Sequence, residues 1–291
     1  MSESAIEVNG LRKLYDDTVA VDGLDLTVRR GEIFALLGPN GAGKTTTIEI
    51  LEGYRRRDGG SVTVLGVDPA VVHARGARTD PAARRWRERV GIVLQGTGEF
   101  DELTVGEVVT HFARFYPHPD DPAGVIDRVG LTAKATARTH TLSGGQKRRL
   151  DVALGIVGRP ELLFLDEPTT GFDPEARREF WALIRGLAAT GTTIVLTTHY
   201  LEEAETLADR VGVITAGRLV AVDTPHELGD RDSAQATVSW RTPEGVWERT
   251  QSATPTALVA DLAARFGGEV PGLTVTRPTL EDIYLTMIGK A

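Results

Sequence analysis

One stretch of the chain combines closely spaced glycines with a lysine and two threonines, residue types that together hold a phosphate chain. The stretch reads Gly38, Pro39, Asn40, Gly41, Ala42, Gly43, Lys44, Thr45, Thr46. Glycines let successive backbone N–H groups turn toward an anion, and Lys44 adds a full positive charge for the outer phosphates. The spacing matches the phosphate-binding loop pattern, in which a hydroxyl such as that of Thr45 holds Mg²⁺. The alternative is a flexible glycine turn ahead of a core helix.

The residues on either side of this loop predict the elements that must position it. The apolar run from Ile33 to Leu37 predicts a buried strand before the loop, and Thr47 to Leu51 can continue as a helix. A helix that starts at the loop adds the positive end of its dipole to the phosphate site. The order strand, glycine loop, helix therefore favours phosphate binding over a simple turn.

Two carboxylates follow the apolar run from Leu162 to Leu165. Because open α/β sheets bind ligands at the carboxyl ends of their strands, we expect Asp166 and Glu167 to face the site of the glycine loop. Asp166 can bind Mg²⁺ directly or through water. Glu167 is placed to accept a proton from the water that attacks the γ-phosphate. The alternative is that both acids leave the strand for solvent.

Two other predicted strands also end at a polar residue. His199 follows a β-branched strand at 192–198, where an imidazole can hydrogen-bond a γ-phosphate or the attacking water. Gln95 follows an apolar run at 90–94, where an amide can orient a water or complete a metal shell. A purely structural role is the alternative for each.

A second glycine-rich segment, Leu142-Ser143-Gly144-Gly145-Gln146, opens a helix predicted over 147–157. Ser143 is a natural N-cap, and the two glycines expose the N–H groups of the first turn. The segment is either a second phosphate-binding helix terminus or an ordinary capped helix start.

Two single residues complete the candidate set. Asp173, followed by Pro174, predicts the N-cap and first residue of another helix. Tyr15 lies in a strand upstream of the glycine loop, where an aromatic ring can stack on a nucleotide base or be half buried in its sheet.

Composition sets the outer limits. The chain has 291 residues, 41% of them hydrophobic and 25% charged, which fits one large domain and a small one. The net charge of −8 argues against a general nucleic-acid binder, so we expect no nucleic-acid partner. There are no cysteines, which excludes disulfides and thiolate metal sites. We find no signal peptide and no membrane-spanning run, so we expect a cytoplasmic chain whose membrane role needs a partner.

The remaining pattern predicts how the chain is divided. Strands at 6–15 and 19–28 predict an N-terminal antiparallel β subdomain, and a further strand is expected at 61–67. A helical insertion is expected at about 96–159. The arginine-rich stretch 73–89 favours a solvated helix face, since the overall charge is acidic. We place a domain boundary at residue 228, followed by a small α+β domain over 229–291.

Over about residues 5–225 these motifs resemble the ATP-binding subunit of an ATP-binding cassette (ABC) transporter. That family carries a P-loop, a glutamine loop, an LSGGQ signature, an aspartate followed by a glutamate, an aspartate loop and a switch histidine, in this order. The matching residues here are 38–46, Gln95, 142–146, Asp166 with Glu167, Asp173 and His199. Tyr15 sits where the family stacks an aromatic ring on adenine. Phe172 precedes Asp173 where leucine is commoner, which puts only the packing of that loop in doubt.

The resemblance implies an α/β fold: a RecA-like P-loop NTPase core with the antiparallel β subdomain and the helical subdomain. It implies catalysis by Glu167, His199, Gln95 and Lys44, and Mg²⁺ binding by Thr45, Gln95 and Asp166. It also implies that ATP is bound by Tyr15, residues 38–46 and Asp173 together with Ser143, Gly144, Gly145 and Gln146. Two cassettes, expected to be identical, would pair head to tail around the nucleotide and drive an integral membrane permease from its cytoplasmic face.

The C-terminal tail resembles cassettes that serve exporters of drugs, antibiotics or polysaccharides. This resemblance covers only the last fifth of the chain, ending in the segment Leu280-Glu281-Asp282-Ile283-Tyr284-Leu285, and the alternative is a stabilising or dimerising appendage. The expected function is therefore an ATPase that powers export of a drug-, antibiotic- or lipid-like substrate. The alternative is a soluble cassette ATPase that acts on nucleic acid or ribosomes.

Overall fold

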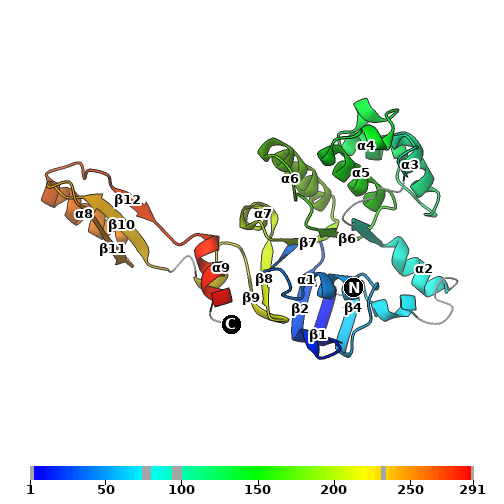
Figure 1. Ribbon diagram of the computed structural model, residues 1–291, viewed down its shortest axis with the longest axis horizontal. Coiled ribbons are helices and arrows are strands. Elements are labelled where there is room, and N and C mark those ends of the chain that lie inside the picture. Colours follow the sequence, from blue (N-terminus) through cyan, green and yellow to red (C-terminus); the bar gives the residue numbers. More distant parts are fainter. Residues whose placement is uncertain (1–2, 74–79, 94–99, 231–233, 290–291) are drawn as a thin grey trace. The chain divides into compact units, whose positions relative to one another are not determined.

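The computed structural model describes residues 3–73, 80–93, 100–230 and 234–289. The chain divides into two compact units, Met1–Val222 and Asp223–Ala291 (Figure 1). The boundary expected from the sequence was residue 228, a few positions further along the chain.

A six-stranded sheet in the order β5-β6-β7-β3-β8-β9 forms the centre of the first unit. Its strands are β3 (Ile33–Leu37), β5 (Val90–Val93), β6 (Leu162–Asp166), β7 (Thr193–Thr198), β8 (Arg210–Thr215) and β9 (Arg218–Asp223). The pairings from β5 to β8 are parallel. All residues of β3 and β7 are buried, which explains why these strands are continuous apolar or β-branched runs in the sequence.

The register of this sheet brings the carboxyl ends of its central strands side by side. Leu37 of β3 pairs with Thr198 of β7, and Asp166 of β6 pairs with Thr197. The loops that follow β3, β6 and β7 therefore leave the sheet along one edge, as expected for an open α/β sheet. The helices that follow these loops are α1 (Lys44–Leu51), α6 (Pro174–Ala189) and α7 (Leu201–Leu207).

The predicted N-terminal β subdomain is confirmed as an antiparallel sheet in the order β2-β1-β4. Its strands are β1 (Ser4–Tyr15), β2 (Thr18–Arg29) and β4 (Gly59–Val64). The predicted end of β4 at Val67 is wrong. Leu65 and Gly66 have φ values of 51° and 81°, and the N–H of Val67 donates to the carbonyl of Val64, so a tight turn ends the strand. Apolar residues of this sheet, α1, β3 and β6 form one core.

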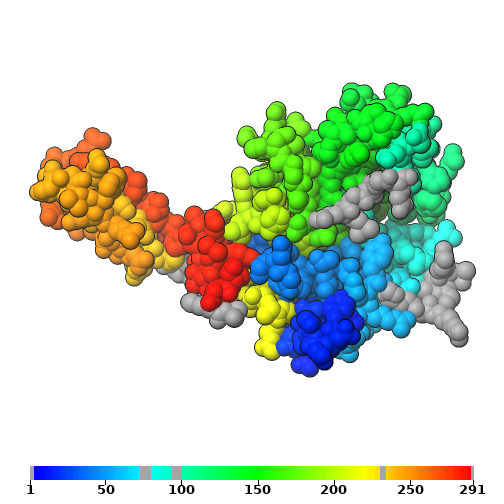
Figure 2. Space-filling view, in the orientation of Figure 1, coloured from blue at the N-terminus to red at the C-terminus, as the bar shows by residue number. Residues whose placement is uncertain are grey.

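The helical insertion between β5 and β6 is also confirmed. It contains α3 (Val105–Ala113), α4 (Pro122–Arg128) and α5 (Gly144–Ile156), and the space-filling view shows these helices as one continuous block, coloured green (Figure 2). A shorter helix, α2 (Pro81–Glu88), precedes β5 and exposes Arg84, Arg85 and Arg87, as predicted for a solvated face. Within the described ranges, no helix combines the length and apolarity that crossing a bilayer requires.

The second unit is the expected small α+β domain. It contains β10 (Ala236–Arg241), β11 (Trp247–Ser252), α8 (Pro255–Phe266), β12 (Thr274–Thr276) and α9 (Leu280–Gly289). Its strands form an antiparallel sheet in the order β11-β10-β12, and Val238, Trp240 and Leu262 belong to its core. Thr279 and Asp282 form a capping box at the start of α9, because each residue's side chain accepts a hydrogen bond from the other's backbone N–H.

Candidate nucleotide-binding and catalytic site

The glycine loop that joins β3 to α1 is tightly packed at two of its glycines. A Cβ at Gly38 would lie 2.3 Å from the carbonyl oxygen of Ile214, and one at Gly43 would lie 2.4 Å from that of Ala20. Gly43 also has a φ of 102°, which residues with a side chain rarely adopt. Both positions therefore require glycine. The first N–H groups of α1, which have no partner within the helix, follow directly.

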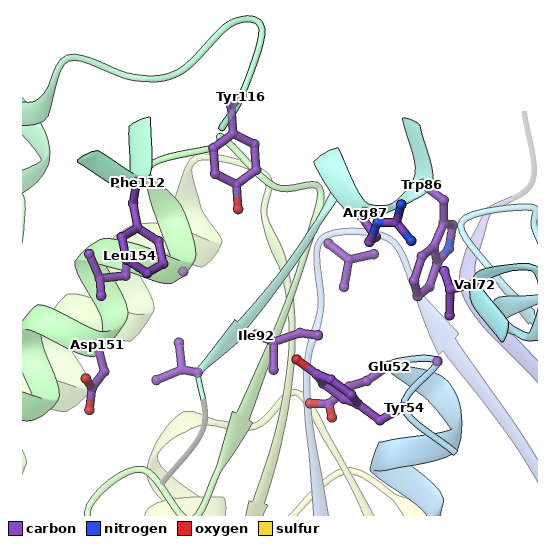
Figure 3. Close-up of a pocket in the computed structure, with 14 residues that line it drawn as sticks. Glu52, Tyr54, Val72, Trp86, Arg87, Ile92, Phe112, Tyr116, Asp151 and Leu154 are labelled. Carbon is purple, nitrogen blue, oxygen red and sulfur yellow. The ribbon is translucent and has the colours of Figure 1, made fainter. Parts of the chain in front are cut away.

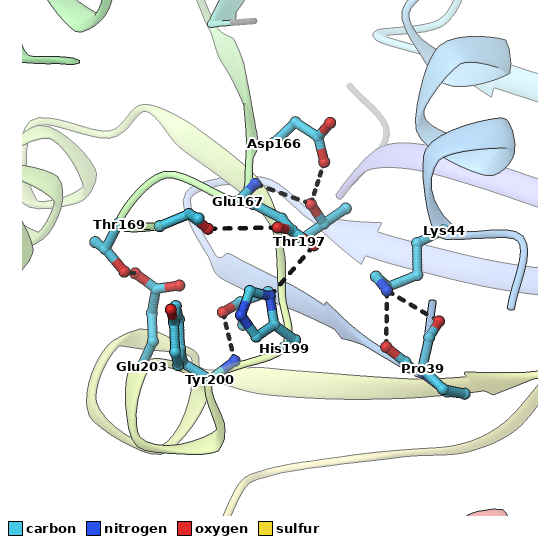
Figure 4. A network of polar contacts seen from close by, with 12 residues as sticks. Pro39, Lys44, Asp166, Glu167, Thr169, Thr197, His199, Tyr200 and Glu203 are labelled. Carbon is cyan, nitrogen blue, oxygen red and sulfur yellow. Dashed lines mark hydrogen bonds and ion pairs between the residues drawn. The ribbon is translucent and has the colours of Figure 1, made fainter. Parts of the chain in front are cut away.

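Lys44 folds back into this loop. Its side chain is buried, and Nζ donates hydrogen bonds to the carbonyl oxygens of Gly38 at 2.7 Å and Pro39 at 3.1 Å (Figure 4). Burial lowers the pKa of the Lys44 ammonium, and the nearby carboxylates of Glu167 and Asp166 oppose that shift. A cation is thus held inside the loop, close to the acids at the end of β6.

The two acids at the end of β6 lie beside Thr197 of β7 (Figure 4). Asp166 accepts a hydrogen bond from the Thr197 hydroxyl, and the backbone N–H of Glu167 donates to the Thr197 carbonyl at 3.1 Å. Glu167 has a φ of 41°, in the left-handed region that costs a residue with a side chain roughly 1–3 kcal/mol. This strained turn is maintained by the surrounding hydrogen bonds, a pattern common at catalytic sites.

His199 meets Glu167 across the same edge. Its Nδ1 lies 3.3 Å from Oε1 of Glu167, and its ring packs against Tyr200 with a centroid separation of 4.1 Å. The hydroxyl of Thr170 approaches the other Glu167 oxygen at 3.3 Å. The Glu167 carboxylate is thus held by an imidazole and a hydroxyl, an arrangement that can accept a proton from a water molecule.

The second glycine-rich segment forms the helix start that the sequence predicts. The N–H of Gln146 donates to Oγ of Ser143 at 3.3 Å, and the N–H of Ser143 donates to Oε1 of Gln146 at 3.1 Å. This reciprocal capping box begins α5. Ser143 and Gly144 are exposed, so the N-terminus of α5 is accessible to an anion outside this chain.

The sequence interpretation missed the arginine that connects α5 to the catalytic strand. Arg148 is buried, and its guanidinium donates to the backbone carbonyls of Asp166 at 2.7 Å and Pro168 at 3.2 Å. Nothing in the sequence sets Arg148 apart, because it lies between two other basic residues, Lys147 and Arg149. Its contacts tie the capped helix to the end of β6.

Asp173, Tyr15 and Gln95 are the other candidate residues, and the structure describes the first two. Asp173 caps α6 as predicted, accepting from the N–H groups of the next two non-proline residues at 3.0 and 2.8 Å. Tyr15 is partly exposed, with Nζ of Lys13 and the guanidinium of Arg55 at 5.4 and 5.1 Å from its ring centroid. Gln95 lies outside the described residues.

The donor set fits a nucleotide and a magnesium ion. Among the described residues, no group of three or more histidine and carboxylate side chains forms a self-contained metal site. Magnesium bound to a nucleotide needs only one or two protein ligands, because phosphate and water oxygens complete its shell. Asp166 and the exposed Thr45 would supply those ligands.

Comparisons with known proteins agree with this geometry. The family model described as ABC transporter matches residues 21–170. A solved structure, cbiO1 from Clostridium perfringens, described as part of the ABC transporter complex cbiONQ, superposes with a TM-score of 0.70 and 29% sequence identity. That superposition covers 78% of this chain and 90% of cbiO1.

Two curated relatives extend the similarity to the whole chain. The Nod factor export ATP-binding protein I of Ralstonia nicotianae is 39% identical, over 99% of this chain and 95% of its own length. The daunorubicin resistance ATP-binding protein DrrA3 of Streptomyces coeruleorubidus is 37% identical, over 99% and 97%. Both alignments include the C-terminal unit. The chain therefore belongs to the ABC transporter ATP-binding family, whose members bind and hydrolyse ATP.

Proposed function

We propose that this chain hydrolyses Mg²⁺-ATP to power export of a drug-, antibiotic- or lipid-like substrate through a separate permease. The observation that carries the proposal is the meeting of Lys44, Asp166, Glu167 and His199 at one edge of the parallel sheet. The printed names of the relatives, Nod factor export and daunorubicin resistance, support export.

The chemistry follows from what each side chain can do. The ammonium of Lys44 exchanges its two carbonyl partners for phosphate oxygens, which gain more from a full charge. Glu167 accepts the proton of the attacking water, and His199 orients the γ-phosphate. Asp166 and Thr45 would hold Mg²⁺, which would neutralise charge on the phosphates.

A second copy of this chain completes the site in this proposal. Ser143 and Gly144 are exposed and make no contact with the glycine loop of their own chain among the described hydrogen bonds. Placed against the triphosphate of a partner copy, the N-terminus of α5 supplies N–H donors and a positive dipole. ATP then binds the paired state far better than the separated one, and this differential affinity drives the conformational cycle.

The ATPase assay on Glu167→Gln tests the chemistry. The amide cannot act as a base, so turnover should fall about 100-fold or more while ATP binding stays near wild type. Lys134→Gln, a change at an exposed lysine of the helical subdomain, is the control and should hydrolyse ATP normally. Wild-type turnover in the Glu167→Gln variant would remove Glu167 from its role.

A large apolar groove is the proposed docking surface for the permease, on the cytoplasmic face of the membrane. The groove has a volume of about 570 Å³ and lies between the core and the helical subdomain (Figure 3). One wall carries Trp86 and Val72, and the opposite wall carries Phe112 and Leu154. Residues that directly follow α1 and residues of α5 both line it.

This placement links the groove to ATP. The N-terminus of α1 forms the glycine loop, and the N-terminus of α5 carries the Ser143 segment. A permease segment seated in the groove therefore contacts the distal parts of both helices. The groove is lined largely by apolar residues, which suits an amphipathic segment of a membrane protein.

Co-sedimentation with membranes of the native host tests the docking surface. Phe112→Arg places a charge in the groove and should lower the membrane-bound fraction. Phe115→Arg, at an exposed ring that does not line the groove, is the matched control and should bind normally. Equal binding of the two variants would contradict the assignment.

The alternative function, a soluble cassette acting on nucleic acid or ribosomes, is not favoured. The chain carries a net charge of −8, whereas nucleic-acid binders present basic surfaces. The relatives that align over its full length are named for export and drug resistance.

A further inference from the structure

A buried glutamate links the helix after His199 to the turn that carries Glu167. Glu203 lies on α7, four residues beyond His199, and is fully buried. Its Oε1 accepts a hydrogen bond from the hydroxyl of Thr169 at 2.9 Å (Figure 4). The same oxygen accepts a second hydrogen bond, from Nε1 of Trp181 at 3.1 Å. Burial raises the pKa of this carboxyl, and hydrogen bonds from the side chains of Thr198, Thr169 and Trp181 oppose that shift, so these donors stabilise a group that is costly to bury alone.

Thr169 and Trp181, the two donors to Oε1, come from different elements. Thr169 belongs to the turn between Glu167 and Asp173, which joins β6 to α6, and it is fully buried. Trp181 lies on α6, one turn or more beyond that segment. One carboxylate oxygen therefore holds the catalytic turn through Thr169 and the body of α6 through Trp181.

Other contacts already hold α7 against α6. Arg177 of α6 stacks on Tyr200 at 4.7 Å and pairs with Glu202 at 3.6 Å. Arg185 of α6 donates to the carbonyl of Thr206 at 2.6 Å. The bond to Trp181 adds to this set. The bond to Thr169 is different, because it reaches the segment that sets the position of Glu167.

We propose that Glu203 is a positioning residue. Through Thr169 it holds the turn after Glu167 against α7, the helix that follows His199. This contact keeps the Glu167 carboxylate and the His199 imidazole aligned for hydrolysis. The inference rests on the proposed ATPase function. Glu167 has a strained backbone, and strain of this kind persists only where neighbouring contacts fix it. Loss of the Thr169 contact lets the turn relax and moves the carboxylate away from His199.

Two variants that each remove one donor to the same oxygen test this role. Thr169→Val keeps the shape of the side chain and removes its hydroxyl, and kcat for ATP should fall about tenfold. KM for ATP should stay within about twofold, because the glycine loop is untouched. Trp181→Phe removes the other donor, and its kcat should stay within about twofold of wild type. Both variants should melt a few degrees lower, since each loses a buried hydrogen bond.

Glu203→Gln provides the rescue arm. The amide retains a carbonyl oxygen that accepts from both donors, so its kcat should stay close to wild type. Equal falls in kcat for the threonine and tryptophan variants would show a merely structural role and overturn the inference. Wild-type kcat in Thr169→Val would also overturn it. If the wild-type chain itself failed to hydrolyse ATP, the proposed function would fail instead, so the two failures are distinguishable.

Discussion

The two ends of strand β6 differ in how their acidic side chains are paired. Before the strand begins, Glu161 is paired with Arg30 at 2.8 Å and with Arg89 through two bonds of 2.5 and 3.0 Å. The hydrogen bonds and charge of Arg89, followed by those of Arg30, lower the pKa of Glu161 to about 2. Where the strand ends, Asp166 and Glu167 are held by hydroxyls and an imidazole, and no lysine or arginine of the described residues forms an ion pair with them.

This difference in ion pairing means that the amino end of β6 contributes to stability, whereas the carboxyl end, five residues further along, carries the candidate catalytic groups. The amino end is charge-compensated, which fastens β5, β6 and the entry to β3 together. The carboxyl end keeps two acids that form no ion pair with a lysine or arginine of the described residues, and a strained backbone at Glu167. Those features lower stability but leave carboxylates ready for a cation and a proton, a common compromise at active sites.

A buried acid near the carboxyl end extends the contrast. Glu52 follows α1, lines the apolar groove described above and is buried. Burial raises its pKa to about 8, and the charges of Asp166 and Glu49 add to that shift. The pKa values of Glu52, at the end of α1, and Glu161, just before β6, are therefore shifted in opposite directions.

Lys44→Ala should have the largest effect of the variants in this comparison, because it removes the lysine cation that lies near the carboxyl end of β6. ATP affinity should fall about 10- to 100-fold, as expected for loss of charged hydrogen bonds to phosphate. Titration calorimetry with ATP measures it. Lys134→Ala, at an exposed lysine of the helical subdomain, is the control and should bind normally. Unchanged ATP affinity in the Lys44 variant would show that the Lys44 ammonium does not bind the phosphates.

The pH dependence of stability should reveal Glu52. Its folded-state pKa lies above the unfolded value of 4.5, so the folded chain binds more protons between about pH 4.5 and 8. Stability from this group therefore falls as pH rises through that window, by about 2–3 kcal/mol from pH 5 to pH 7. Urea unfolding at both pH values should show this fall in the wild type and a smaller one in Glu52→Gln. Parallel curves for the two proteins would contradict the assignment.

Thr197→Val should weaken magnesium binding without unfolding the chain. The hydroxyl of Thr197 donates to Asp166, and loss of a bond that orients a metal ligand costs about tenfold in metal affinity. ATPase activity measured against Mg²⁺ concentration should shift by that factor. Thr193→Val removes a hydroxyl at the other end of β7, where it accepts from Gly31 N–H, and should leave the curve in place.

Glu161→Gln should have the smallest effect, and on stability alone. Because the pair is about 40% exposed, we expect a loss of only about 1 kcal/mol and a melting temperature a few degrees lower, with kcat unchanged. The depressed pKa means that this contribution is present above about pH 4.5 and disappears as pH falls toward 2. Wild type and variant should therefore converge in acid. A fall in kcat would show that the ion pairs at the amino end of β6 also affect catalysis at its carboxyl end.

Local patterns were readable from the sequence. The cap of Ser143 with Gln146 depends on residues three positions apart, and the cap at Asp173 is equally local. The meeting of Lys44, Asp166 and His199 was also predicted, because each follows a buried strand and parallel strands end at one edge. The roles of these residues in catalysis stay predictions.

Long-range pairs were not readable. Arg89 was assigned to a solvated basic face, yet it pairs with Glu161, 72 positions away. The contacts of Arg148 with the end of β6 and of Glu203 with Thr169 likewise join separate elements. Nothing in residue spacing distinguishes a buried charged partner from an exposed one, since burial is decided by tertiary packing.

Disulfide crosslinking between copies tests the central claim, that ATP is clasped between the glycine loop of one chain and the α5 start of another. The chain has no cysteines, so Asn40→Cys and Ser143→Cys can be introduced separately into the Glu167→Gln background and mixed. A crosslinked dimer should form with Mg²⁺-ATP, little of it should form without nucleotide, and none should form when Lys134→Cys replaces Ser143→Cys. A crosslink that forms equally without ATP, or fails to form at saturating ATP, would contradict it.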